Sequence, residues 1–402
     1  MKITDLKVHL LTGHWGSDPW FPRYLFSTAI IRIETDAKLE GLGEVSASFF
    51  VPEAVPAIAE FFKPLLIGRD PLDIDALIKA MYDGSVWWGR AGLGRGVQSG
   101  IELALWDLKG KALGLPVYRL IGGKLRERVP VYASGGGSYW PIAETVRKVS
   151  FYRRLGYRAT KLATNFHHPQ RVNKKTGHTQ VDPVHFPFSR RIENLNRCFA
   201  QLRRVCGDDM DLAVDGHQGA TPNPIPVSEA VATAQALAPH RLRFYEEPLA
   251  YTNLDGYCEL RAQSPIPIAG GESLTGVDQF HNLISRAGVD FVQPDVGVCG
   301  GLLETVKILH HAEAFNVGTI PHTGGSFGPV LAAAWHLAVA HPNIPFLEHV
   351  PAARSMHDDF LVEPLKFKDG SLAAPTAPGL GVRLTPKLLE KYRFVPGTGA
   401  RT

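Results

Sequence analysis

Acidic residues and one histidine recur at nearly even intervals through the second half of this 402-residue chain. Consecutive members lie 31, 26, 23, 27 and 26 residues apart, and each closes a short apolar run that is typical of a β-strand. The six residues are Asp215, Glu246, Glu272, Asp295, His322 and Glu348. In a β/α barrel, one strand, one helix and two loops occupy roughly 25 to 30 residues. The spacing therefore predicts a barrel whose strand ends bring these side chains together at one mouth.

The N-terminal part of the chain does not follow this rhythm. Strand-like alternation and helical periodicity mix there, in the segments 3–11, 28–36, 54–66 and 73–82. We therefore predict an α+β domain at residues 1–128 and a barrel domain at 129–354. After Glu348 the chain leaves the barrel, and residues from about 355 to 402 are expected to complete the first domain.

Composition excludes several classes of protein. The chain has 45% hydrophobic and 20% charged residues, as soluble globular proteins do. Its formal net charge is only +4 and its basic residues are interspersed with acids, so nothing indicates binding to nucleic acid. No apolar run approaches the roughly 20 residues that span a bilayer, and the N-terminus lacks a signal-peptide pattern. Four cysteines without CxxC spacing indicate free thiols, so we predict a cytoplasmic protein without a membrane partner.

The first three residues of the series predict a metal site. Asp215, Glu246 and Glu272 end three successive predicted strands, and three converging carboxylates repel one another unless a cation lies between them. Ligation by oxygen atoms alone suits Mg²⁺, with Mn²⁺ as a substitute. Glu247 is an ambiguous neighbour, because strand alternation lets only one residue of the pair point inward.

The next two residues predict an acid–base pair. Asp295 and His322 end adjacent strands, where the carboxylate can hold one imidazole nitrogen and leave the other free as a base. His217 follows Asp215 by two residues, so a continuing strand would place both on one face. If Gly216 breaks that alternation, His217 is instead a solvated loop residue.

Two further strand ends carry charged residues. Lys161 ends the second predicted barrel strand, where a cation can pair with a substrate carboxylate or with a metal ligand. Glu348 ends the eighth strand, where a protonated carboxyl can donate a hydrogen bond to a developing enolate oxygen. Each could also be a plain salt-bridge partner.

Loops near the mouth are candidates for substrate contact. The candidates in the N-terminal loops are His14, Trp15, Trp20, Arg23, Tyr24 and Phe49. For the aromatic residues the alternative is packing against the barrel. An insertion at 164–187, with four His and no clear helical or strand periodicity, follows the second strand and is expected to overhang the mouth or a subunit contact.

Taken together, these motifs resemble those of the enolase superfamily, within its mandelate racemase-like subgroup. The resemblance rests on the segment 99–123, Glu-Glu-Pro at 246–248, Gly-Gly-Glu at 270–272, Gln-Pro-Asp at 293–295, and His322. It implies an α+β capping domain over a modified (β/α)7β barrel of TIM type, and symmetric homo-oligomers. It also implies Mg²⁺ bound by the three acids, with Glu246 rather than Glu247 as ligand. The reaction that it implies is removal of the proton α to a carboxylate, with the enediolate stabilised by the metal and by Glu348.

One departure from the family pattern guides the choice of reaction. The second-strand segment reads Lys161-Leu162-Ala163 and lacks the second lysine of Lys-x-Lys, which disfavours a two-base Lys/His racemase. Asp215-Gly216-His217 instead resembles the Asp-x-His arrangement of galactonate and mannonate dehydratase-like enzymes. We therefore predict a Mg²⁺-dependent lyase, a dehydratase of a sugar acid of the galactonate, gluconate or mannonate type.

In that prediction His322, oriented by Asp295, takes the C2 proton of the sugar acid, and His217 protonates the departing C3 hydroxyl. Lys161 helps to hold the substrate carboxylate, and the product is a 2-keto-3-deoxy acid. The two histidines exchange roles if the C2 configuration is opposite. Alternatives are an epimerase, racemase or cycloisomerase that acts through the same enediolate and, more remotely, a non-catalytic binding protein.

Overall fold

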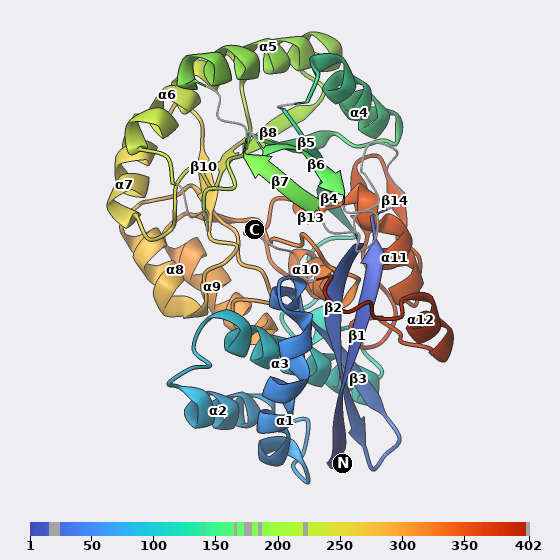
Figure 1. Cartoon of the computed structure of the whole chain (residues 1–402). Helices are drawn as coiled ribbons and strands as arrows, with labels where there is room; N and C mark the ends of the chain where they lie inside the picture. Colours follow the sequence, from blue (N-terminus) through green and yellow to red (C-terminus); the bar gives the residue numbers. More distant parts are fainter. Residues whose placement is uncertain are drawn as a thin grey trace.

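The protein is described from a computed structural model. It describes residues 1–15, 25–138, 140–164, 167–172, 179–183, 187–219 and 224–398, with only the backbone for 167–172 and 179–183. Figure 1 shows two parts, a smaller α+β part that contains the N-terminus and a ring of strands and helices formed by most of the remaining chain.

The smaller part is a three-stranded antiparallel sheet of order β1-β2-β3 with helices packed on it. Its elements are β1 (Ile3–His14), β2 (Leu25–Thr35), β3 (Glu40–Val45), α1 (Val55–Leu66), α2 (Ile74–Ser85) and α3 (Gly92–Leu113). Glycine is required where β3 crosses α3, because a Cβ on Gly41 or Gly43 would lie 2.0 or 1.9 Å from a carbonyl oxygen of the helix. Helix α3 ends at Gly114, which has a left-handed φ of 67°.

The larger part is a run of parallel strands whose first and last members pair. In the described part of the chain its strands are β4 (Arg128–Gly137), β5 (Ala159–Ala163), β8 (Asp211–Asp215), β9 (Tyr245–Glu246), β10 (Ile268–Gly270), β11 (Phe291–Val292), β12 (Gly318–Thr319) and β13 (Leu347–His349). Neighbours pair in chain order from β4 to β12, and β13 pairs with β4. The last strand thus lies beside the first.

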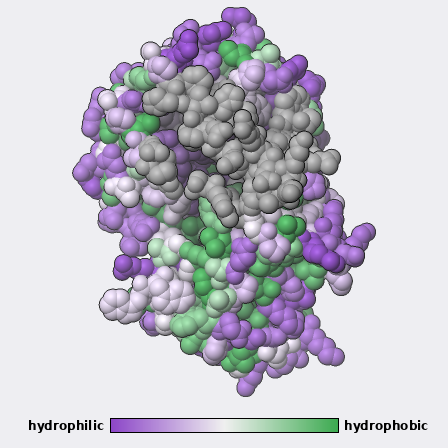
Figure 2. Space-filling model, in the orientation of Figure 1, coloured by the Kyte–Doolittle hydropathy of each residue, from purple (hydrophilic) through white to green (hydrophobic). Residues whose placement is uncertain are grey.

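A helix follows each strand from β4 to β12, which gives the order (β/α)7β. These helices are α4 (Ile142–Arg154), α5 (Phe188–Cys206), α6 (Val227–Leu237), α7 (Leu254–Gln263), α8 (Gly276–Ser285), α9 (Leu302–Ala314) and α10 (Pro329–Ala340). Figure 1 shows α4 to α9 in an arc around the strands. Their outer surface over α5 and α6 is mostly hydrophilic in Figure 2, whereas hydrophobic residues gather on the visible face of the capping domain.

The inside of the barrel is filled by side chains from alternate strands. Tyr132, Ala213, Ala269 and Ile320 come from the first, third, fifth and seventh strands or their ends, and they form one buried cluster with Phe244. Burial of a large apolar side chain contributes about 1.5–3 kcal/mol. This packed layer closes the barrel beneath the strand ends that carry the predicted site.

The insertion after the second barrel strand differs from the sequence expectation. The insertion, for which no strand periodicity was expected, contains a two-stranded antiparallel hairpin of β6 (His167–Val172) and β7 (Thr179–Pro183). Backbone pairing between the two segments forms the strands, although their Pro- and His-rich sequence shows no strand alternation. The expectation that it overhangs the mouth stays a prediction.

The C-terminal tail runs along the barrel and then returns to the capping domain. It contains α11 (Arg354–Phe360), β14 (Phe367–Lys368), β15 (Ser371–Ala373) and α12 (Pro386–Lys391). Strand β15 pairs with β4, and the Thr12 N–H of β1 donates to the Tyr392 carbonyl at 2.9 Å. The exact domain boundaries remain predictions.

Two further expectations can be compared with the structure. Cys198, Cys206, Cys258 and Cys299 are all free thiols, as predicted. Within the described ranges, none of the helices has the length and apolarity that would let it cross a bilayer.

Candidate active site

The carboxyl ends of the barrel strands bring the predicted residues together. Asp215 at the end of β8 lies opposite Glu246 at the end of β9 in the parallel register. Beyond β11 and β12, Asp295 and His322 form an isolated parallel bridge. Hydrogen bonds and ion pairs, described below, link these residues to Lys161, His217, Glu272 and Glu348. The even spacing in sequence therefore corresponds to a cluster in space.

Lys161 lies at the centre of the acids. Its ammonium contacts Asp215 at 3.0 Å and Glu348 at 3.2 Å, and it also donates to Glu246. Burial lowers the pKa of Lys161, but these three carboxylates outweigh burial and raise the pKa well above its ordinary value. Lys161 is therefore a permanent cation in this arrangement.

The acids exceed the positive charge that faces them. Burial, and then Asp215, raise the pKa of Glu246 to about 8, although Lys161 opposes the change. Burial and the neighbouring Glu272 and Asp215 carboxylates also raise the pKa of Glu247 well above its ordinary value, and the Glu247 Oε1 atom is buried without a hydrogen-bond partner. The mouth thus holds more buried carboxyl groups than Lys161 alone can pair with.

The Asp295–His322 pair has the geometry of an oriented base. His322 Nδ1 lies 2.8 Å from Asp295 Oδ2, and His322 Nε2 faces Glu272 at 3.5 Å. The Gly297 N–H also donates to Asp295 Oδ1 at 2.7 Å, which fixes the carboxylate. Burial lowers the pKa of His322, but Glu272 and Glu348 outweigh it and raise the pKa well above the ordinary value. With Nδ1 held by Asp295, Nε2 is the nitrogen available for proton transfer.

His217 reaches the site by a different route from the one that strand alternation predicts. Strand β8 ends at Asp215, and His217 has a left-handed φ of 47°, so the alternation is broken as the alternative reading allowed. The turn nevertheless returns the ring, and His217 Nε2 lies 3.0 Å from Asp215 Oδ2. Desolvation lowers the pKa of His217, but Asp215 raises it to about 9. Its side chain remains 45% exposed and is therefore accessible from the mouth.

Glu348 is held as an acceptor. Its Oε2 accepts the Thr323 N–H at 2.8 Å, and Lys161 contacts its Oε1. Burial raises the pKa of Glu348, but Lys161 and His322 outweigh burial and lower it below the ordinary value. The carboxyl is therefore ionised here, and donation to an enolate oxygen would require that it take up a proton in the substrate complex.

The three predicted metal ligands fit a hard divalent cation by donor chemistry. Asp215, Glu246 and Glu272 offer only carboxylate oxygens, and the raised pKa of Glu246 reflects negative charge that a cation would relieve. Their arrangement is not that of a closed metal site, since among the described residues no three His, Cys, Asp or Glu side chains are grouped so as to hold an ion. Lys161 instead pairs with two of them. Their role as ligands stays a prediction.

Two residues that contact the site were missed in the sequence. Gln293 Nε2 donates to Glu246 Oε2 at 2.6 Å, and Ser46 Oγ donates to Asp295 Oδ2 at 3.1 Å. Gln293 follows the end of β11 at Val292, and its place in the Gln-Pro-Asp motif, two residues before Asp295, was a usable signal. Ser46 comes from the capping domain, and no local pattern links it to a barrel residue.

The predicted substrate contacts divide into three groups. Trp15 and Phe49 pack on Phe26 with ring centroids 5.4 and 5.8 Å apart, and Phe26 in turn packs on Phe327 at 4.9 Å. This is the packing alternative, although Phe327 belongs to the loop that carries His322. His14 is exposed at the end of β1. Trp20, Arg23 and Tyr24 lie outside the described residues.

Family comparisons agree with this geometry. Residues 143–388, more than half of the chain, match the family described as Enolase C-terminal domain-like. Residues 25–122 match the Mandelate racemase / muconate lactonizing enzyme, N-terminal domain. The chain belongs to the enolase superfamily. The family and the fold class that the motifs predicted are therefore confirmed.

Relatives within this superfamily extend over nearly the whole chain. The chain is 32% identical over 406 residues to D-galactonate dehydratase of Xanthomonas campestris pv. campestris, which covers 98% of this chain and 95% of that protein. It is 29% identical over 409 residues to D-galactarolactone cycloisomerase of Agrobacterium fabrum, with 98% and 99% covered.

A solved structure gives the same picture. The 3,6-anhydro-D-galactonate cycloisomerase of Zobellia galactanivorans has a TM-score of 0.82 at 28% identity and covers 98% of this chain and 99% of its own. The predicted enzyme class, a hydro-lyase, agrees with the name of the dehydratase relative.

Proposed function

We propose that the protein is a sugar acid dehydratase that removes the C2 proton and the C3 hydroxyl of a hydroxylated carboxylic acid. One observation carries this proposal: two imidazoles reach the same mouth, each held by a different carboxylate. His322 is held by Asp295 at 2.8 Å, and His217 by Asp215 at 3.0 Å. Elimination of water needs one group to accept a proton and another to supply one.

The steps balance with these two residues. His322 Nε2 takes the C2 proton, and the electron pair left at C2 is delocalised into the carboxylate as an enediolate. His217 gives its proton to the C3 hydroxyl as the C–O bond breaks, so water leaves. The resulting enol tautomerises to a 2-keto-3-deoxy acid.

Asp215, Glu246 and Glu272 are the residues that we propose as ligands of Mg²⁺, for which Mn²⁺ could substitute. A bound divalent cation would neutralise the buried carboxylates and make the substrate carboxylate a better electron acceptor. Lys161 would hold the substrate carboxylate, and Glu348 would stabilise the enediolate once it carries a proton. Asp295 would keep His322 in the tautomer that exposes Nε2.

Two variants separate the proposed roles when the protein is supplied with Mg²⁺ and a set of sugar acids in deuterated water. His322→Asn is expected to abolish both C2 deuterium exchange and dehydration. His217→Asn is expected to retain exchange and lose dehydration, because it removes only the acid. Asp295→Asn serves as a control and should slow both steps together, since it disturbs the base. Persistent dehydration by both histidine variants would contradict the assignment.

A second function is favoured by particular relatives, the two cycloisomerases of sugar acid derivatives. In a cycloisomerase the same enediolate would form, but no water would be released. Nuclear magnetic resonance of the products distinguishes the two, because only dehydration produces a 3-deoxy methylene group.

A further inference from the structure

Helices α9 and α10 both begin at a glycine, and the local side chain that caps α10 is Ser326, whose hydroxyl accepts the Gly328 and Leu331 N–H groups at 3.1 and 3.3 Å. Their N-cap residues are Gly301 and Gly328, and neither N-cap has a side-chain hydrogen bond. The first N–H groups of a helix need acceptors from elsewhere. Asp295 and His322 are called the dyad below. Each glycine follows one member of this dyad by six residues, from Asp295 to Gly301 and from His322 to Gly328.

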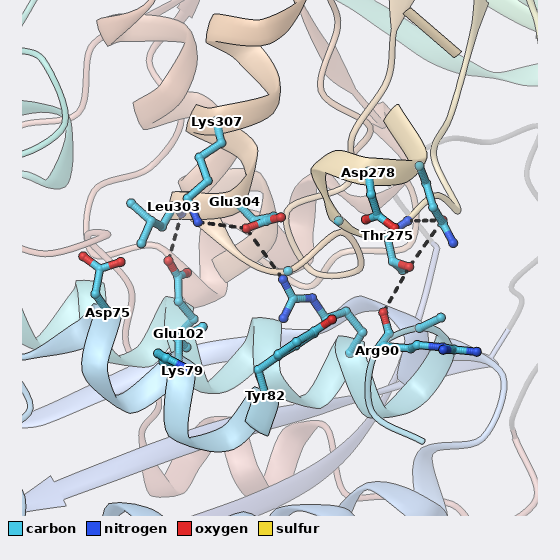
Figure 3. Close-up of a pocket in the computed structure, with 16 residues that line it drawn as sticks. Asp75, Lys79, Tyr82, Arg90, Glu102, Thr275, Asp278, Leu303, Glu304 and Lys307 are labelled. Carbon is cyan, nitrogen blue, oxygen red and sulfur yellow. Dashed lines mark hydrogen bonds and ion pairs between the residues drawn. The ribbon is translucent and has the colours of Figure 1, made fainter. Parts of the chain in front are cut away.

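The acceptor for α9 is Glu102, which belongs to α3 of the capping domain. Its Oε2 accepts the Leu302 N–H at 2.8 Å, and its Oε1 accepts the Leu303 N–H at 2.9 Å and the Trp106 indole N–H at 2.7 Å. Figure 3 shows Glu102 reaching from its helix to the backbone at Leu303. The carboxylate is 0% exposed, so removing these donors would leave a buried charge unpaired.

The acceptor for α10 from the capping domain is Glu44, which lies within strand β3. Its Oε1 accepts the Phe327 N–H at 2.7 Å, and its Oε2 accepts the N–H groups of Gly328 and Val330, each at 3.3 Å. The Ser326 hydroxyl donates to the same carboxylate at 3.0 Å. This one acid of the capping domain thus accepts three hydrogen bonds from the loop that follows His322 and one from the first turn of α10.

Smaller contacts also join the loop after Asp295 to the capping domain. Ser99 Oγ on α3 accepts the Gly300 N–H at 3.0 Å, and Ser46 Oγ donates to Asp295 itself at 3.1 Å. Gly301 has a φ of 96°, and a Cβ there would lie 2.3 Å from Glu102 Oε2. The backbone after Asp295 therefore lies directly against α3 with no room for a side chain.

Beside these contacts, the junction of the two domains opens into a crevice of about 660 Å³, lined by α2, α3, α8 and α9. Figure 3 shows Glu102, Leu303 and Glu304 at its wall. Arg95 of α3 contacts Glu304 of α9 at 3.7 Å, and Glu304 Oε1 accepts the Val277 N–H of α8 at 2.9 Å. None of the predicted catalytic residues lines the crevice, and Arg95 and Glu304 form an ion pair across the domain junction.

We propose that Glu44 and Glu102 are positioning residues for the proton-transfer dyad. Each caps the barrel helix that follows one dyad member, so the capping domain fixes the loops 295–301 and 322–328 from outside the barrel. The dyad then depends on domain docking as well as on the strands that carry it. This inference rests on the proposed function for the role of the dyad, but the docking itself can be measured without turnover.

The test compares Glu44→Gln and Glu102→Gln with Asp107→Asn in the full-length protein. Asp107 is an equally buried acid on α3, but it accepts the N–H groups of Leu42 and Leu380, away from the dyad loops. Hydrogen–deuterium exchange followed by mass spectrometry reports loop protection. Steady-state kinetics and C2 deuterium exchange on a sugar acid report the reaction.

We expect Glu44→Gln to raise amide exchange in residues 323–331, and Glu102→Gln to raise it in residues 296–306. Both should lower kcat about tenfold while KM changes less than twofold, because the base is misplaced but substrate contacts remain. Asp107→Asn should lower thermal stability without either effect. Amide exchange that rises equally throughout the chain, or a loss of kcat no larger than that of Asp107→Asn, would overturn the proposal.

A milder variant keeps the test decisive if a glutamine variant does not fold. Ser99→Ala removes one acceptor from the Gly300 N–H and should raise exchange only near residues 299–302, with a smaller fall in kcat. Unchanged exchange and kcat in that variant would also contradict the proposal. If the wild-type protein dehydrates no sugar acid, the proposed function fails, and the local exchange pattern alone decides whether Glu44 and Glu102 hold these loops.

Discussion

Two regions of the molecule bury glutamates completely, and they surround them differently. Glu246 in the barrel mouth and Glu102 at the domain junction are both 0% exposed. Burial raises the pKa of both, to about 8 for Glu246 and about 7 for Glu102. At the junction, every other contact favours the ionised form of Glu102. In the mouth, the carboxylates of Asp215, Glu348 and Glu272 disfavour the ionised form of Glu246 further, so they add to the effect of burial on its pKa.

This difference supports the proposal that Glu102 is a structural acid and Glu246 a functional one. Glu102 meets two backbone N–H groups and an indole N–H, which together define a helix cap. Glu246 meets Lys161 and Gln293 but also faces other carboxylates. Buried charge without enough donors has a high free-energy cost, and this cost is the reason for the proposal that a further cation binds in the mouth.

The largest expected effect comes from neutralising the acid in the mouth. Glu246→Gln, or removal of divalent cations by a chelator, should lower the dehydration rate by about 10²- to 10³-fold or more, because charge on the enediolate loses its stabilisation. Glu102→Gln should lower it only about tenfold, as expected for a residue that acts through a loop rather than on the reacting atoms. Steady-state rates with added Mg²⁺ test this. Equal losses in the two variants would remove the distinction between the regions.

Buried histidines outside the mouth should make the protein sensitive to acid. Burial lowers the pKa of His336 and of His357 to about 4, so both are neutral in the folded protein. As the pH falls from about 6.5 to 4, the unfolded chain takes up protons that the folded chain does not, and each histidine costs about 3 kcal/mol of stability. Urea unfolding at pH 7 and pH 4.5 should show this loss, and His336→Gln should reduce it. Identical losses with and without His336 would contradict the account.

In the metal-free protein, the variant with the smaller loss of rate, Glu102→Gln, should show the larger loss of stability. Glu102→Gln should lower the free energy of unfolding by about 1–3 kcal/mol, because an amide group then faces N–H donors. Glu246→Gln should cost less or even stabilise, because it relieves repulsion among buried carboxylates. Chemical unfolding in the presence of a chelator measures both values. A larger loss in Glu246→Gln would show that the mouth acid is structural.

The smallest effect is expected for an exposed ion pair beside the crevice. Lys79 and Asp83 are four residues apart on α2, with side chains 74% and 58% exposed. Exposed pairs of this kind contribute about 0.3–0.5 kcal/mol. Lys79→Ala should therefore change the free energy of unfolding by less than about 0.5 kcal/mol, and a much larger change would mean that charge at the junction matters beyond its buried acids.

Much of the barrel and its mouth could be predicted because they repeat. Regular strand ends predicted that Asp215, Glu246, Asp295 and His322 would meet, and parallel pairing does place them opposite one another in two pairs. His217 was placed for the wrong local reason, since a left-handed turn rather than strand alternation brings it to Asp215.

Contacts between domains were not predictable in the same way. Ser46 lies 249 positions from Asp295, and Glu44 lies 283 positions from Phe327. No periodicity relates residues so far apart, and their pairing depends on how the capping domain docks. The motif that contains Glu102 supported the family resemblance, but its role as a cap for α9 became visible only in three dimensions.

Calorimetric titration of Mg²⁺ into the metal-stripped protein is the most direct test of the central claim. The claim is that the acids of the mouth, such as Glu246, bind a cation and that those of the domain junction, such as Glu102, do not. The account predicts saturable binding in the wild-type protein, retention of that binding in Glu102→Gln, and its loss in Glu246→Gln. Unaltered binding in Glu246→Gln, or no binding to the wild-type protein, would contradict it.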